Sequence, residues 1–154
     1  MFKHVIVAVD DSDDSYKAAE IGIEIAKLFS GKVTLAYVVT DEYIKSIYGD
    51  AKRIRKTNSL LDDYLLDQAR TSIIGNQVFG KLVSLAQKMH FSNIETKMLN
   101  GNPSSELVNE IQGGAYDLAI VGRTGASKAQ RSIFGNIIDP VVQLTSIPTL
   151  IVNK

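Results

Sequence analysis

The stretch Asp117-Leu-Ala-Ile-Val-Gly-Arg-Thr-Gly125, followed by Gly135-Asn136, decides how we expect this chain to fold. Its first half is short, apolar and β-branched toward its end, which is typical of a parallel strand buried on both faces. Residues 137–144 carry apolar side chains at helical spacing, and Asn136 is a residue type that caps helices well. The pattern therefore predicts a strand, a loop punctuated by glycines and the start of a helix.

The loop of this unit, residues 122–136, has the features of an anion site. Glycine lets the backbone approach a ligand closely, and the free N–H groups at a helix start attract negative charge. An alternative interpretation is that the glycines only give shape to a long loop. The residues by themselves leave both interpretations open.

Length and composition set the class of protein. A chain of 154 residues with 45% hydrophobic content suits one domain, 1–154. Its 17 basic and 17 acidic side chains cancel, so charge gives no argument for a nucleic-acid or membrane-surface partner. The absence of cysteine excludes disulfides, thiolate metal sites and cysteine nucleophiles. With neither a signal-peptide pattern nor an apolar run of membrane-spanning length, we expect a soluble cytoplasmic protein.

The same alternation of strand and helix runs through the rest of the chain. Further strands are expected at 5–9, 32–39, 94–99 and 149–152. The helices between them are expected from Asp11 or Ser12 to about 29, from 59 to about 89, and from 103 to about 113, the last with Asn102 as its cap. Strands that alternate with helices predict a parallel sheet with right-handed crossovers.

Glycines are expected to punctuate these helices. Gly31 follows the first helix and is expected to end it, as Gly113-Gly114 does for the helix that starts at 103. Gly75 and Gly80 fall inside the helix at 59–89, where we expect them to weaken it and to kink or interrupt it.

Three other patterns carry less functional weight. The run 75–81 matches most of a phosphate-binding P-loop, but Leu82 stands where Ser or Thr must coordinate Mg²⁺, and the run lies in a helical pattern. Residues 40–58 are polar with basic side chains at 52–56, which indicates a solvated loop with a helical turn or, as the alternative, a basic patch for a partner. His4 and His90 stand apart without metal-ligand spacing, so both are expected to be structural or surface residues.

The expected topology makes Asp10 a candidate ligand-binding residue. It follows the first strand, and Gly122 follows the fourth. In an open α/β sheet, ligands bind beyond the carboxyl ends of the strands where the strand order reverses. If these two strands are neighbours, a nucleotide can lie between them, with Asp10 accepting hydrogen bonds from the ribose and 122–136 holding the phosphates. The alternative is that Asp10 only caps a turn.

Over essentially its whole length the chain resembles the universal stress proteins. The matching segments are 5–10 with Ser12 and Ser15, then 101–103, 117–125 and 146–152. ATP-binding members carry Gly, two residues, Gly, nine residues, Gly and then Ser or Thr. Three glycines here, Gly122, Gly125 and Gly135, fit that spacing, whereas Asn136 departs from it.

The resemblance implies a fold and a site. The fold is a doubly wound, five-stranded parallel sheet of order 3-2-1-4-5 with helices on both faces, a Rossmann-like arrangement of the adenine nucleotide alpha hydrolase type. The adenine is expected to meet the backbone near Ala8, Val38 and Val121, with Asp10 toward the ribose. The phosphates are expected to be surrounded by Gly122, Arg123, Gly125, Gly135, Asn136 and Ile137.

The resemblance also implies a function, an ATP-binding regulatory module of the stress response that prefers ATP to GTP. Mg²⁺ or Mn²⁺ is a candidate companion of the nucleotide, and no metal ligand or catalytic residue is assigned. A homodimer through antiparallel pairing of strand Thr149–Val152 is implied as well. Two alternatives stay open. One is a slow ATPase, for which no base stands near the loop, and the other is a dimeric adaptor with a decayed nucleotide site, which Asn136 favours.

Overall fold

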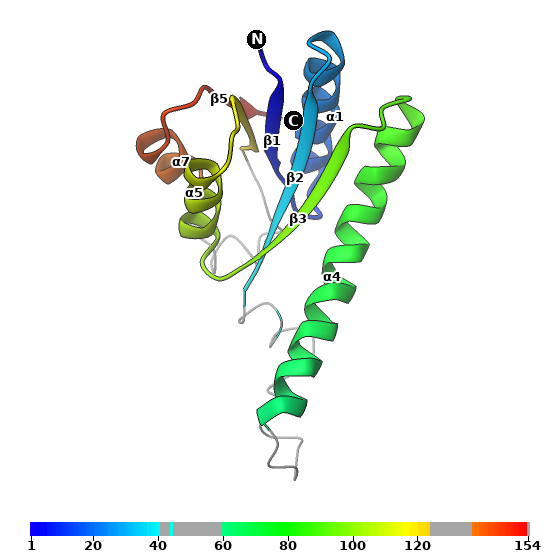
Figure 1. Cartoon of the computed structure of the whole chain (residues 1–154), viewed down its shortest axis with the longest axis vertical. Helices are drawn as coiled ribbons and strands as arrows, with labels where there is room; N and C mark the ends of the chain where they lie inside the picture. The colour runs from blue at the N-terminus through cyan, green and yellow to red at the C-terminus, as the bar shows by residue number, and fades with distance from the viewer. Residues whose placement is uncertain (41–43, 45–59, 124–136, 154) are drawn as a thin grey trace.

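The computed structural model of the protein describes residues 1–40, 44, 60–123 and 137–153. Within these residues, one sheet of five parallel strands has the order β3-β2-β1-β4-β5 (Figure 1). The strands are β1 (His4–Ala8), β2 (Lys32–Val39), β3 (Ile94–Asn100), β4 (Leu118–Gly122) and β5 (Thr149–Val152). The expected fold class and strand order are confirmed, and each strand lies within one residue of its expected bounds.

Two pairs of helices cover the two faces of the sheet (Figure 1). The helices are α1 (Asp13–Leu28), α4 (Leu60–Lys88), α5 (Pro103–Gly113) and α7 (Ile138–Leu144). Side chains of β1 alternate between the faces, because Val5 and Val7 pack with α1 and α4 whereas Ile6 packs with α5 and α7. None of the helices in the described part of the chain is long and apolar enough to cross a membrane.

The helix starts follow the expected capping residues in two cases and differ in a third. Ser12 caps α1 and Asn102 caps α5, each by accepting a hydrogen bond from a backbone N–H of the first turn. The expectation that Asn136 caps the last helix is wrong. Helix α7 starts at Ile138, and its N-cap is Ile137, which makes no side-chain capping bond. Asn136 itself lies outside the described residues.

Gly113 and Gly114 end α5 as expected, with Gly114 as its C-cap. Gly31 and Gly75 act through close packing instead of the roles expected of them. The left-handed residue after α1 is Ser30, with φ of 51°, while a Cβ on Gly31 would lie 2.8 Å from the carbonyl oxygens of Phe2 and Lys3. Helix α4 continues without interruption through both of its glycines, so the expected break is absent. A Cβ on Gly75 would lie 1.8 Å from the terminal methyl of Met98, so this glycine lets α4 approach β3.

The P-loop-like run 75–81 lies inside α4, as the helical pattern predicted. A phosphate-binding P-loop needs backbone N–H groups that point at the ligand from a loop. In a helix interior those groups are bonded to the preceding turn. The run is therefore part of a structural helix. The expected loop at 40–58 lies, apart from Thr40 and Ile44, outside the described residues.

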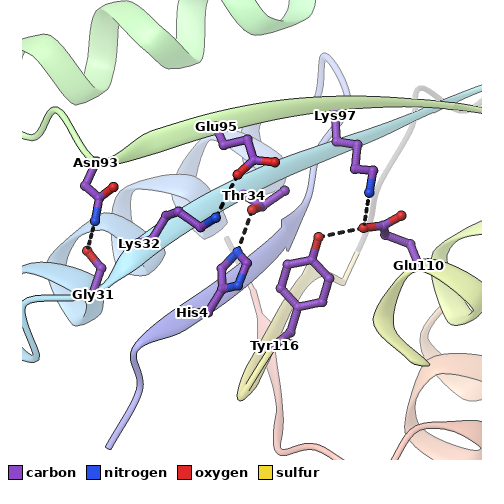
Figure 2. Close-up of polar contacts among 9 residues, drawn as sticks. All are labelled: His4, Gly31, Lys32, Thr34, Asn93, Glu95, Lys97, Glu110 and Tyr116. Atoms are coloured by element: carbon purple, nitrogen blue, oxygen red, sulfur yellow. Dashed lines mark hydrogen bonds and ion pairs between the residues drawn. The ribbon is translucent and has the colours of Figure 1, made fainter. Parts of the chain in front are cut away.

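The ring of His4 contacts Thr34 and Tyr116 at the amino end of β1 (Figure 2). Its Nε2 lies 2.8 Å from Oγ1 of Thr34, and its ring centroid lies 4.4 Å from that of Tyr116. Burial, with a contribution from the positive charge of Lys32, lowers the pKa of His4. The residue thus has the structural role expected of it. It lies at the amino ends of the strands, opposite the carboxyl ends where a ligand is expected.

A carboxylate completes this polar cluster on the side of α5 (Figure 2). The Tyr116 hydroxyl donates to Oε1 of Glu110 at 2.6 Å, and Nζ of Lys97 binds the same oxygen at 2.7 Å. Burial works to raise the pKa of Glu110, but these two hydrogen bonds outweigh it and lower that pKa. Burial and the bond to Glu110 raise the pKa of Tyr116. The cluster ties the start of β4 to β3 and α5.

Candidate functional site

The carboxyl ends of β1 and β4 form the point where the strand order reverses. From β1 the order runs to β2 and β3 on one side and to β4 and β5 on the other. Ala8 at the end of β1 is in register with Val121 of β4 and with Ala36 of β2. Helix α1 leaves β1 toward one face of the sheet, and α7 packs on the other face. Diverging connections of this kind leave a crevice at the strand ends, where ligands bind in open α/β sheets.

The expected adenine contacts lie on three adjacent strands at this crevice. Ala8 and Val121 are register partners, and Val38 lies two residues beyond Ala36 on β2. Ala8 and Val38 are half-buried, and Val121 is buried. The structure therefore places three apolar residues side by side near the carboxyl ends of the strands. Small-molecule sites are mostly lined by apolar side chains.

Asp10 is held by hydrogen bonds to the first turn of α1. Its backbone N–H donates to Oγ of Ser15 at 2.8 Å, and its Oδ1 accepts from the backbone N–H of Ser12 at 2.8 Å. The interpretation that Asp10 caps a turn is thus correct for this oxygen. A carboxylate can accept about four hydrogen bonds, so capping does not exclude hydrogen bonds from a ribose.

Gly122 ends β4 directly against α1. A Cβ at this position would lie 3.1 Å from Cβ of Asp14 and 3.3 Å from the backbone nitrogen of Ser15. A side chain at 122 would therefore press on the first turn of α1, so Gly122 has a packing role besides the phosphate contact expected of it. The next residue, Arg123, is exposed, and its N–H donates to the carbonyl of Val152 at 2.8 Å.

Of the other residues expected to surround the phosphates, only some lie in the described part of the chain. Gly125, Gly135 and Asn136 lie outside the described residues. Ile137 is partly buried against the core formed with α5 and α7. The structure thus places Ala8, Asp10, Val121 and Gly122 at or just beyond the carboxyl ends of two neighbouring strands, with Val38, Arg123 and Ile137 on neighbouring segments.

A cavity of about 390 Å³ adjoins Asp10, between the start of α1 and helix α4. Its lining residues are Asp10, Asp11, Ser12, Asp13, Tyr16, Ile74, Gln77, Val78, Lys81 and Leu82. Sequence reasoning missed the α4 side, although the spacing of Gln77, Val78, Lys81 and Leu82 would have placed them on one helix face. As far as the described residues go, no group of three acidic or histidine side chains is arranged to hold a metal ion.

Solved structures share this fold. The universal stress protein UspA from Lactobacillus plantarum matches with a TM-score of 0.69 at 20% identity, covering 98% of this chain and 97% of that one. A universal stress protein in complex with cAMP matches with a TM-score of 0.64 at 20% identity, covering 98% and 96%. A universal stress protein from Archaeoglobus fulgidus in complex with dAMP has a TM-score of 0.64 at 16% identity and covers 98% of each chain.

Sequence comparison assigns the chain to the same group of proteins. Universal stress protein MJ0531 of Methanocaldococcus jannaschii is 27% identical over 154 residues, covering 100% of this chain and 84% of the relative. The profile of the universal stress protein family matches residues 1–153. This chain therefore belongs to the universal stress protein family.

Proposed function

We propose that the protein binds ATP in the crevice between β1 and β4 and acts as a nucleotide-responsive regulatory module of the cytoplasmic stress response. One observation carries the proposal. Gly122 ends β4, and Asp10 follows the end of the neighbouring strand β1 by two residues, at the point where the strand order reverses. Structural neighbours in complex with cAMP or dAMP support an adenine nucleotide as the ligand class.

The described residues fit a nucleoside at this position. Backbone groups near Ala8, Val38 and Val121 would face the adenine, and such groups distinguish adenine from guanine by their pattern of donors and acceptors. Asp10 would accept hydrogen bonds from the ribose. The phosphates would extend toward the segment after Gly122, accompanied by Mg²⁺ or Mn²⁺.

Calorimetry with three nucleotides tests the proposal. ATP should bind more tightly than GTP, and 2′,3′-dideoxy-ATP should bind more weakly than ATP because it lacks both ribose hydroxyls. Asp10→Asn keeps an oxygen for the Ser12 amide but replaces the other oxygen by a donor. It should weaken ATP binding about tenfold, the range of one hydrogen bond to a charged group, and leave dideoxy-ATP nearly unchanged.

A matched control removes a negative charge on α1, away from Asp10. Glu24 is exposed, so Glu24→Gln changes the net charge by the same amount as Asp10→Asn and should leave both affinities unchanged. Wild-type protein that binds no ATP at millimolar concentration would refute the proposal. Nucleotide turnover in Mg²⁺ or Mn²⁺ would identify a slow ATPase, and protein isolated from cells without nucleotide would favour an adaptor.

We also propose a homodimer through the free edge of β5. Leu150 and Ile151 on this strand are 37% and 40% exposed, although both are large and apolar. Among the described strands, β5 pairs only with β4. An apolar strand edge invites pairing with a second chain, and a two-fold antiparallel arrangement limits itself to a dimer.

A further inference from the structure

Asp10, Ser12 and Ser15, where β1 leads into α1, form a closed ring of hydrogen bonds. The N–H of Asp10 donates to Oγ of Ser15 at 2.8 Å, the N–H of Ser15 donates to Oγ of Ser12 at 3.2 Å, and the N–H of Ser12 donates to Oδ1 of Asp10 at 2.8 Å. Each side chain accepts from the backbone of the next residue. The ring therefore holds both the backbone and the carboxylate of Asp10 against the first turn of α1.

The Ser15 hydroxyl accepts the hydrogen bond of the Asp10 N–H, which a carbonyl of the neighbouring strand would accept if β1 continued. The N–H of Val9 still bonds to the carbonyl of Ala36 on β2 at 2.8 Å, whereas the N–H of Asp10 bonds to Ser15. Ser15 is only 2% exposed, so water is poorly placed to replace its hydroxyl. Removal of a buried acceptor leaves its donor unsatisfied, which costs more than the loss of an exposed hydrogen bond.

The ring also packs against the end of β4, at Gly122. The backbone nitrogen of Ser15 lies 3.3 Å from the place where a Cβ of Gly122 would stand. Ser15 thus lies between the two strand ends that bound the crevice, with its hydroxyl on Asp10 and its backbone against Gly122. A displacement of this turn would move the Asp10 carboxylate relative to β4.

We propose that Ser15 is the positioning residue of the nucleotide site: its buried hydroxyl fixes Asp10 so that the carboxylate meets the ribose hydroxyls. The inference rests on the proposed function, because it assigns Ser15 a role only through Asp10. Ser15 does not touch the nucleotide in this proposal. Its loss should therefore matter for nucleotides with ribose hydroxyls and not for those without them.

Helix α5 offers a matched control for this role. Ser105 is the third residue of α5, as Ser15 is of α1, and its N–H likewise donates to the side chain of the N-cap, Asn102, at 3.1 Å. Ser105 is exposed and lies on the other face of the sheet. Ser105→Ala thus repeats the change in helix composition without touching Asp10.

Calorimetry with ATP and 2′,3′-dideoxy-ATP tests the role. Ser15→Ala should weaken ATP binding about tenfold, the size of one lost hydrogen bond to a charged group, and change dideoxy-ATP binding less than about twofold. Ser105→Ala should change neither. Circular dichroism confirms that each variant is folded. If Ser15→Ala does not fold, Ser15→Cys takes its place with the same expectations, because it keeps the shape of the side chain with a larger atom that accepts hydrogen bonds more weakly.

Three results would overturn the positioning role. The first is an equal loss of affinity for ATP and dideoxy-ATP in Ser15→Ala. The second is an unchanged ATP affinity in Ser15→Ala, and the third is the same loss of ATP affinity in Ser105→Ala. If Asp10→Asn removes the preference for ATP over dideoxy-ATP while Ser15→Ala keeps it, the proposed function stands and only the role of Ser15 fails. If wild-type protein binds the two nucleotides equally, the contact between Asp10 and the ribose fails, and the role of Ser15 fails with it.

Discussion

At the scale of single residues, Gly122 has a structural role that is separable from ligand binding. Because a Cβ there would lie 3.1 Å from Cβ of Asp14, Gly122→Val should lower the free energy of unfolding by about 1–3 kcal/mol, the usual range for overpacking. Urea denaturation measures this loss. At Gly113 an added Cβ meets nothing within 4 Å, so Gly113→Val is the control, and equal stability of both variants would contradict the prediction.

Gly125 then becomes the cleaner test of the phosphate loop. By the family resemblance it is expected to lie beside the phosphates, and Gly125→Val should reduce ATP affinity at least tenfold without the stability loss of Gly122→Val. Calorimetry together with urea denaturation separates the two effects. Unchanged ATP affinity in folded Gly125→Val would place the phosphates elsewhere.

Asn136 is the residue at which the chain departs from the family spacing. An amide still donates a hydrogen bond, but a hydroxyl both donates to phosphate and helps to hold a metal ion. Asn136→Ser should therefore tighten ATP binding in Mg²⁺ or Mn²⁺, and it should do so less in EDTA. Equal or weaker affinity by calorimetry would mean that asparagine already serves as a full substitute.

His4 gives the protein a pH dependence near neutrality. Burial first, and then the charge of Lys32, lower its pKa below the ordinary 6.5, against a backbone hydrogen bond at Ala115 and the charges of Glu95 and Asp117. The unfolded chain then binds a proton more readily than the folded one. Stability should fall as the pH drops through 6.5 and level off below the folded pKa of His4.

Urea denaturation at pH 7.5 and 5.5 measures this effect. His4→Gln should be less sensitive to pH than the wild type, whereas His90→Gln, a change at an exposed histidine, should keep the wild-type difference. The lowered pKa values of Glu95 and Glu110 act below their ordinary value of 4.5, outside this interval. Identical pH sensitivity of His4→Gln and wild type would rule out His4 as the source.

At the scale of elements, the two glycines of α4 differ in what surrounds them. A Cβ on Gly80 meets nothing within 4 Å, so Gly80→Ala should gain the helix propensity of alanine, about 0.5–1 kcal/mol in the free energy of unfolding. At Gly75 the same change requires the terminal methyl of Met98 to move, so Gly75→Ala should gain less or lose stability. Chemical denaturation of both variants measures these two changes in the free energy of unfolding. A larger gain in stability from Gly75→Ala than from Gly80→Ala would contradict the prediction.

At the scale of the whole molecule, β5 is the edge on which the proposed dimer depends. Light scattering should find a dimer at tens of micromolar. Leu150→Lys or Ile151→Lys should dissociate it, because a charge at the pairing edge is costly to bury. Gln87→Lys on the exposed face of α4 adds the same charge elsewhere and should leave the dimer intact. A monomeric wild type refutes the dimer, and a dimer that survives both changes on β5 places its interface elsewhere.

The sequence by itself determined the local structure and, through family resemblance, the sheet order. Continuous apolar runs marked β1, β2 and β4 because strands buried on both faces need them, and Ser12, Asn102 and Pro103 marked helix starts by their capping chemistry. These signals are local, since each depends on residues within a turn or a strand. The same locality explains why the helical period of α4 correctly excluded a P-loop at 75–81.

Only the tertiary structure decided what residues distant in the sequence do to one another. Gly31, Gly75 and Gly122 pack against Lys3, Met98 and Asp14, partners that sequence spacing does not indicate. The ring through Ser15 needs β1 to end where α1 begins beside β4, and the cavity beside Asp10 needs α4 to lie along α1. Strand register and helix packing set these distances, because the free energy of a contact depends on separation in space rather than along the chain.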